Sequence, residues 1–189
     1  TRKVADRLQE LFNTMRADYE AKWDDLKIFI EYGILTDEKF SEKAQEELKV
    51  FERAVHDVLD LTMTSFKNGD LNLARQVEPL EEVIDGLSLD VKQRHVRRLR
   101  KGKCTIELGF ILSDVITNFE RVSDHCSNIA VCLVQVNEDE FDTHAYLDEL
   151  RQEDNKDFQS KVLACREKYQ LPPTKQERLA EKNAKLLAE

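Results

Sequence analysis

The stretch 105-TIELGFILSDVITNFERVSDHCSNIAVCLVQV-136 carries one apolar stripe from end to end. Its apolar residues recur at steps of three and four, the spacing that gathers side chains on one face of an α-helix. They are Leu108, Ile111, Leu112, Val115, Phe119, Val122, Cys126, Ile129 and Leu133. Thr105 can cap the start, so the pattern predicts a helix over about 106–136, a rod of roughly 40 Å.

The same periodicity continues on both sides of this stretch. It predicts helices over about 4–30, 39–67 and 71–100. After an acidic linker a further helix is expected over about 143–169, which Pro172-Pro173 stops, and then a short charged tail helix that opens with a Thr174-x-x-Glu177 capping box. Pro79 predicts a kink or a later start in the third of these helices, because proline disrupts a helix interior. Gly69 and Gly102 sit in turns so short that the flanking helices must run antiparallel.

Composition agrees with long helices. The 189 residues include only 5 glycines and 3 prolines, too few for the many turns of a β-sandwich. We therefore expect an all-α, up-down bundle of antiparallel helices. A single domain would cover 1–173, with a core repeat at about 39–136 and the charged tail at 174–189. No apolar run reaches the length of a membrane span, and the four cysteines include no CxxC pair, as in proteins of a reducing cytoplasm.

Two acidic doublets stand out, Glu81-x-x-x-Asp85 and Glu120-x-x-x-Asp124. Residues four apart lie one above the other on a helix, so each doublet presents two carboxylates on one face. Glu81 and Asp124 are equally far along the chain from a turn at 102–103, and so are Asp85 and Glu120. Helical wheels place both doublets on the same side of the helix pair. We expect the four carboxylates to meet at one height beside the seam.

Such a cluster is either an ordinary solvated acidic flank or a cation site, and the pattern alone leaves both interpretations open. Carboxylate oxygens suit hard or borderline cations such as Mg²⁺, Mn²⁺, Fe or Ca²⁺. A ferritin-like di-metal enzyme would need Glu-x-x-His on two helices. No glutamate lies three residues before any of the four histidines, so the sequence disfavours that enzyme.

The sequence around both doublets resembles the PhoU family. The resemblance is carried by Gly69-Asp70-Leu71, by Leu80-Glu81-Glu82-Val83-Ile84-Asp85, and by Phe119-Glu120-Arg121-Val122-Ser123-Asp124-His125-Cys126-Ser127-Asn128-Ile129-Ala130. The three-helix repeat of that family carries an acidic doublet on its middle helix and an E-R-x-x-D-x-x-x-N-I-A signature on its last. A complete PhoU protein has two such repeats, whereas this chain has one.

The resemblance implies a metal-binding regulator of phosphate transport and not an enzyme. It implies that Glu81, Asp85, Glu120 and Asp124, with Asn128 one turn further, bind metal ions of the set Fe, Mn, Mg, Zn and Ca. The stretch 97–135 is most similar to the cytoplasmic domain of bacterial Na⁺/phosphate cotransporter-related proteins. A homo-oligomer at the inner face of the cell membrane is therefore expected, acting on a transporter membrane domain or on the phosphate-uptake machinery. A metal-free helical interaction or dimerisation module is the alternative that periodicity alone supports.

Charge is distributed unevenly along the chain. The formal net charge is -9, which disfavours nucleic acid as a partner. The one basic run consists of Arg94, Arg97, Arg98, Arg100, Lys101 and Lys103. Cations at a helix C-terminus complement its dipole. The alternative is a contact with anionic lipid, a transporter loop or phosphate.

Overall fold

The computed structural model describes residues 40–138, 150–151 and 155–188. It also describes Glu10, Asn13, Thr14, Arg16, Ala17, Glu20 and Ala21. The predicted helix over 4–30 lies outside the described residues apart from these seven, and so does the apolar stripe predicted for it.

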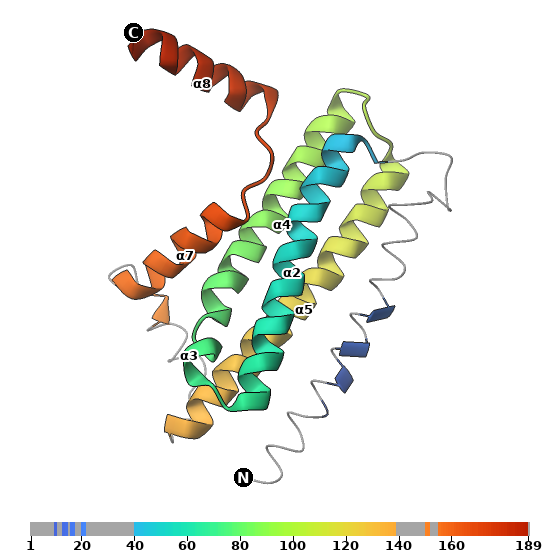
Figure 1. The fold of residues 1–189 in the computed structure, drawn as a ribbon. Helices are drawn as coiled ribbons and strands as arrows, with labels where there is room; N and C mark the ends of the chain where they lie inside the picture. The colour runs from blue at the N-terminus through green and yellow to red at the C-terminus, as the bar shows by residue number, and fades with distance from the viewer. Residues whose placement is uncertain are drawn as a thin grey trace.

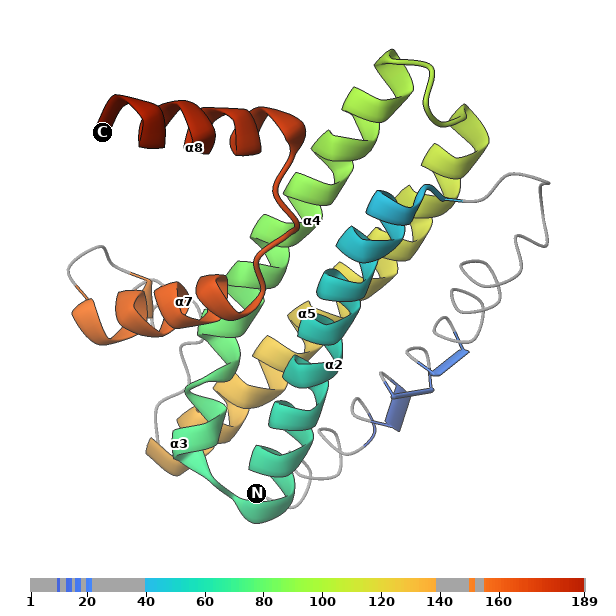
Figure 2. The ribbon, with the colours of Figure 1, turned by 45° about the horizontal axis from the view of Figure 1, so that its top comes forward.

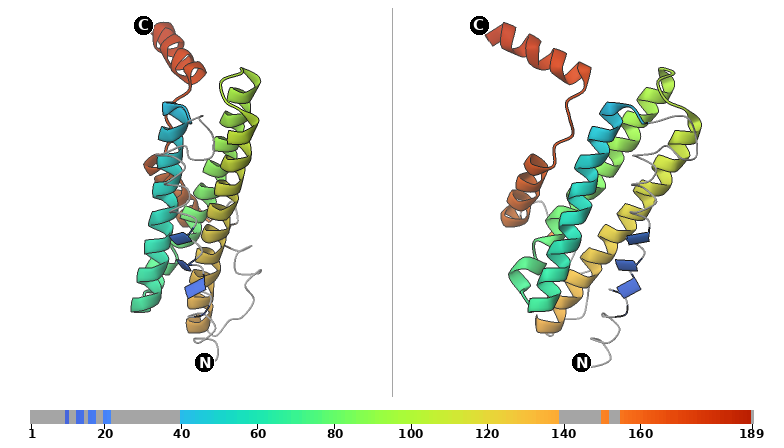
Figure 3. Two further views of the ribbon diagram at one scale, coloured as in Figure 1. Left: turned by 90° about the vertical axis from the view of Figure 1, so that its right-hand side faces the viewer. Right: turned by 45° about the vertical axis from the view of Figure 1, so that its right-hand side comes forward.

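All the regular secondary structure in the described part of the chain is helical, which confirms the predicted all-α class. The helices are α2 (Glu42–Asn68), α3 (Leu71–Ala74), α4 (Val77–Arg100), α5 (Ile106–Glu138), α7 (Lys156–Lys168) and α8 (Lys175–Ala188). Figure 1 shows α2, α4 and α5 side by side, with α4 antiparallel to both α2 and α5. Helix α7 lies against α4, and the short α3, which precedes α4, packs against α2. The two views of Figure 3 show α8 pointing away from this bundle.

Two glycines set the antiparallel course of the chain. Gly69 ends α2 in the left-handed conformation, with φ of 63°, and the side chain of Asp70 then accepts the first backbone N–H groups of α3. Gly102, with φ of 61°, forms the turn between α4 and α5, and Thr105 caps α5. Glycine adopts the left-handed conformation at little cost because it has no Cβ. Both predicted hairpin turns are confirmed.

Pro79 acts as a start signal. The predicted helix over 71–100 is divided into α3, a short turn and α4, which begins at Val77. Pro79 therefore falls in the first turn of α4, where backbone N–H groups have no partner within the helix and proline costs nothing. The later start that the sequence predicts is confirmed.

The core lies between α2, α4 and α5, along the predicted stripes. Its fully buried centre includes Phe51 of α2, Ile84 of α4 and Phe119 of α5, and the rings of Phe51 and Phe119 lie 5.8 Å apart between centroids. Ile116 is also fully buried, although it lies outside the predicted stripe of α5. Because α4 and α5 pack against each other through this core, the acidic doublet of α4 is held level with the acidic doublet of α5.

The prediction of a single helix over 143–169 is wrong. Leu150 is helical, but Arg151 lies in a turn, and α7 begins only after Asn155. The side chain of Asn155 caps α7 by accepting the backbone N–H of Phe158 at 3.2 Å. Phe158 is buried in the core, so α7 is docked by its own apolar face.

The C-terminal part of the fold follows the sequence prediction more closely. Lys168 lies 2.8 Å from Asp57 of α2, and the hydroxyl of Tyr169 donates to the same carboxylate, which ties the end of α7 to α2. Thr174 and Glu177 form the predicted capping box of α8, with bonds of 2.7 and 3.3 Å. Within the described residues, no helix combines the length and the apolarity that crossing a membrane requires.

Candidate metal centre

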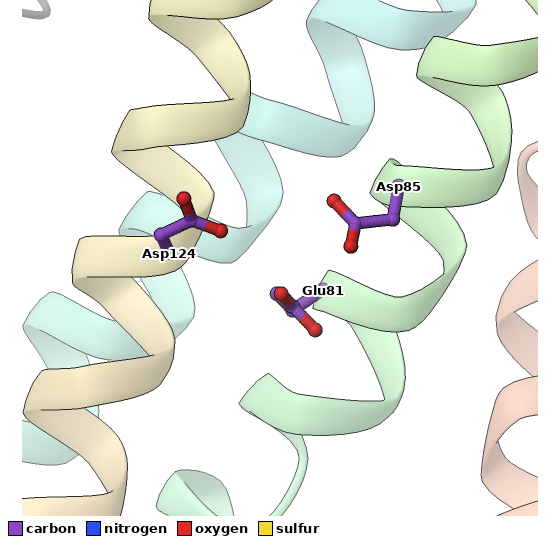
Figure 4. Close-up of side chains that lie close together, drawn as sticks. All are labelled: Glu81, Asp85 and Asp124. Atoms are coloured by element: carbon purple, nitrogen blue, oxygen red, sulfur yellow. The ribbon is translucent and has the colours of Figure 1, made fainter.

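Three of the four predicted carboxylates meet between α4 and α5. Glu81 and Asp85 come from the first half of α4 and Asp124 from α5, and Figure 4 shows their carboxylates turned toward one another. One oxygen of each lies within 4.8 Å of an oxygen of both others. We call these three residues the acidic trio. Glu81 is buried, whereas Asp85 and Asp124 are exposed, so the trio opens to solvent from one side.

Glu120, the fourth predicted residue, is engaged elsewhere. The ammonium group of Lys92 lies 2.9 and 3.0 Å from its two oxygens, and the hydroxyl of Ser88 donates to it. Both partners belong to α4. Ser88 and Lys92 are three and seven residues after Asp85 and continue the same helix face. This spacing is a signal that could have identified both partners.

Glu78 and Arg151 extend the site at its other end, and sequence reasoning missed both. Glu78 is 3% exposed, and it accepts bonds from Arg151 Nε at 2.8 Å and from Ser127 Oγ at 2.5 Å. Arg151 also donates through Nη2 to Glu81 at 3.0 Å. Glu78 stands three residues before Glu81 on one helix face, which is a readable signal. Arg151 comes from the connection before α7, and no local pattern brings it to this seam.

Burial and mutual repulsion shift the titration of the trio. Burial, followed by repulsion from Glu78 and Asp85, raises the pKa of Glu81 to about 8, although Arg151 opposes the shift. Partial desolvation by the packed helices raises the pKa of Asp85, although this residue is exposed overall, and repulsion from Asp124 and Glu120 adds to the rise. The pKa of Asp124 is raised as well, again chiefly by partial desolvation. The trio thus has more negative charge than its surroundings compensate, and it resists full ionisation.

The donor set suits a hard cation. Three carboxylates offer only oxygen atoms, which Mg²⁺, Ca²⁺, Mn²⁺ and Fe prefer over softer ligands. A cation placed among them would replace the proton that the raised pKa values favour. The residues present therefore fit a metal ion of this class, with Glu81, Asp85 and Asp124 as its ligands.

Asn128, the weakest predicted ligand, and the histidine of α4 both lie outside the trio. Asn128 is exposed one turn beyond Asp124 on α5 and is not part of the group. His95 is buried on α4, where its ring lies 3.8 Å from the sulfur of Cys104. A Cβ at Gly109 would come within 3.0 Å of its Nε2, so α5 packs closely over this histidine. His95 is therefore a packed core residue.

The predicted basic run lies at the end of α4. Arg94 and Arg98 both face Glu47 of α2, which is 5% exposed, at 3.4 and 2.7 Å. Arg97, Arg100, Lys101 and Lys103 are exposed. The run thus has two parts, a pair held by a buried carboxylate and a group that faces solvent.

Comparison with known proteins identifies the region that contains the trio. Residues 49–133 match the PhoU domain model, and all three carboxylates fall within them. The chain is 27% identical over 95 residues to the phosphate-specific transport system accessory protein PhoU homolog 1 of Thermotoga maritima. That match covers 50% of this chain and 41% of the relative.

A second, shorter similarity is to a chaperone. The chain is 64% identical over 44 residues to chaperone protein HtpG of Porphyromonas gingivalis and 61% identical over 46 residues to that of Bacteroides thetaiotaomicron. These matches cover 23% and 24% of this chain but only 6% and 7% of the chaperones. No solved structure gives a significant match. The chain thus spans less than half the length of each of these relatives.

Proposed function

Because residues 49–133 are a PhoU domain, we propose that this chain regulates phosphate transport by binding a metal ion at the acidic trio. The relative from Thermotoga maritima is named as an accessory protein of phosphate-specific transport. A regulatory role without catalysis follows from that kinship. We infer no chaperone function from the similarity to HtpG, because the match covers so little of those proteins.

The acidic trio is the observation that carries the metal proposal. Its oxygens lie within 4.8 Å of one another, a separation that one coordinated cation can bridge with small side-chain movements. Glu81 supplies a buried ligand, and the two aspartates supply exposed ones from two helices. A cation held there links α4 to α5, so its binding stabilises their packing.

Arg151 gives the site a connection to α7. Its guanidinium group bonds to Glu81, a member of the trio, and to Glu78 next to it. A metal ion on Glu81 would weaken the hold of Arg151 on that carboxylate by charge repulsion. Of the described hydrogen bonds of Arg151, those to Glu78 would then remain. This is how metal occupancy would reach a surface that a partner can sense.

The proposed partner is the membrane domain of a transporter, in particular a Na⁺-coupled phosphate transporter, or another part of the phosphate-uptake machinery. The domain would act as a homo-oligomer at the inner face of the cell membrane. Coding sequence upstream of residue 1 tests the transporter proposal. At least two segments of about 20 apolar residues would support it. An upstream region with no such segment would reject the transporter proposal, and the domain would then regulate a separate transport system.

Metal content measured with matched variants tests the site. We expect the purified protein to retain Mn or Fe after dialysis, and the Asp85→Asn/Asp124→Asn variant to lose it. A control, Asp90→Asn/Glu107→Gln, removes the same charge from exposed positions of α4 and α5. Equal metal in all three proteins would reject the trio. Phosphate uptake by cells that carry each variant then tests whether metal binding and regulation fail together.

The alternative is a metal-free interaction or dimerisation module. It is favoured by Arg151, which already neutralises part of the acidic seam. If the domain is such a module, phosphate uptake would still depend on its presence. The Asp85→Asn/Asp124→Asn variant would then show the same phosphate uptake as the Asp90→Asn/Glu107→Gln control.

A further inference from the structure

We propose that a basic groove where α4 ends binds a soluble ligand carrying two or more phosphate groups. The groove is lined by the first residues of α2, the last turns of α4 and the segment Pro172–Lys175 that leads into α8. Figure 2 shows this segment crossing α4 before α8 turns away. The proposal does not depend on the acidic trio, which lies near the other end of α4.

The groove has the dimensions of a small-molecule site. Its volume is about 590 Å³, within the usual range for ligand pockets of roughly 300–1,000 Å³. The N-termini of α2 and α8, at Ser41 and Thr174, both open onto it. The positive ends of two helix dipoles therefore add to the charge of the side chains.

Two arginines form a fixed part of the lining. Arg94 and Arg98 share the buried carboxylate of Glu47, and Arg94 also donates to the carbonyl of Pro172 at 2.6 Å. The Nε and Nη2 atoms of Arg98 are buried and have no hydrogen-bond acceptor within the described part of the chain. Buried N–H groups without acceptors are costly. Arg94 also lies 3.6 Å from Glu177, so the unsatisfied donors belong to Arg98, and the cations of the lining still outnumber these carboxylates.

A second group of cations lines the groove. These side chains are Lys43, Arg97, Lys101, Lys103, Lys175 and Arg178. None of the six forms an ion pair with another described residue. In a chain of net charge -9, such a concentration marks a site for an anion. Several cations in so small a volume call for a ligand of several charges, and guanidinium groups bind phosphate oxygens in pairs.

The surroundings favour a soluble ligand over a membrane surface. The cations line a concave groove between three segments, whereas a bilayer presents a flat surface. Glu42 and Glu46 are exposed on the same lining and would repel a continuous anionic sheet. A compact polyphosphate can avoid both carboxylates. The ligand class is therefore a small oligophosphate or a compound that carries one.

Calorimetric titration with inorganic tripolyphosphate tests the proposal, in EDTA so that no metal ion bridges the anion. We expect one saturable site per chain, at least about tenfold weaker in Arg97→Gln/Lys101→Gln, because both side chains are exposed and leave the core intact. The control Lys67→Gln/Lys156→Gln removes the same charge at exposed positions outside the groove and should bind as the wild type does.

Competitors distinguish the sources of phosphate. Sulfate at matched ionic strength should compete poorly, and so should phosphatidylglycerol vesicles. Absence of binding, equal loss in the control, or equal competition by sulfate would overturn the proposal. Displacement by vesicles, with the same loss in Arg97→Gln/Lys101→Gln, would assign the groove to a membrane surface and would also overturn it. None of these outcomes bears on metal binding at the trio.

Discussion

Glu81 is the residue where burial and charge conflict most. It is 5% exposed, it accepts a bond from Arg151, and it faces the two aspartates of the trio. Burial and repulsion outweigh the arginine, so its pKa rises to about 8. A proton or a metal ion can relieve this conflict, and the two compete for the same oxygens.

The raised pKa of Glu81 predicts a pH dependence of stability without metal. Its ordinary value is 4.5, so the protonated form is favoured in the folded state. The stability that it contributes is fully present below pH 4.5 and is lost as the pH rises through about 8. Urea unfolding in EDTA should show the free energy of unfolding of wild type falling relative to Glu81→Gln over this interval. A constant difference between the two proteins would contradict the shift.

Asp85 offers a second test at the same scale. Replacing Asp85 with Asn removes a charge that repels Asp124 and Glu120. Without metal, at neutral pH and low salt, we expect stability to rise or to stay unchanged. An ordinary exposed substitution stays within about 0.5 kcal/mol in either direction. Chemical denaturation in EDTA measures it, and a clear loss would mean that Asp85 has a favourable partner.

At the scale of elements, local signals predicted the helices that local chemistry controls. Gly69, Gly102, Pro79 and the Thr174 capping box mark boundaries that the structure confirms. The predicted single helix over 143–169 is wrong because a new helix, α7, starts inside that range after Asn155. Asn155 is a good N-cap residue and is a local signal that the sequence prediction did not use.

Gly69 and Gly86 differ in backbone conformation, so replacing each with alanine should have opposite effects on stability. Gly69→Ala should destabilise the fold by about 1–2 kcal/mol, because alanine is strained at a φ of 63°. Gly86→Ala should stabilise it by roughly 0.5–1 kcal/mol, since Gly86 lies inside α4 and an added Cβ meets nothing within 4 Å. Thermal melts of both variants test the pair, and a gain at Gly69 or a loss at Gly86 would contradict the described backbone.

The packing of α5 predicts an asymmetry between two neighbours. Ile116 is fully buried, whereas Val115 is only partly buried. Ile116→Ala should cost about 2–5 kcal/mol and Val115→Ala clearly less. The sequence stripe included Val115 and omitted Ile116, so a larger cost at Val115 would favour the sequence-based rotation of this helix over the one in the structure.

At the scale of the whole molecule, register was predictable and partner choice was not. Antiparallel helices joined by a short turn fix which residues lie level, so three carboxylates met as expected. Glu120 does not join the other three carboxylates because it pairs with Lys92. Such long, flexible side chains can reach several partners, and the sequence does not show which one they contact. Arg151 depends on the course of a connection that follows no periodic pattern. The chain's topology, not local sequence, brings it to the seam.

The most direct test of the central claim, a metal ion bound at the acidic trio, is a set of thermal melts with EDTA and with added Mn²⁺. An ion that binds only the folded state stabilises it by about 2.7 kcal/mol at a hundredfold excess over Kd. We predict that the wild type and the Asp90→Asn/Glu107→Gln control gain Tm with Mn²⁺, while Asp85→Asn/Asp124→Asn gains little. Parallel shifts in all three proteins would contradict the metal site.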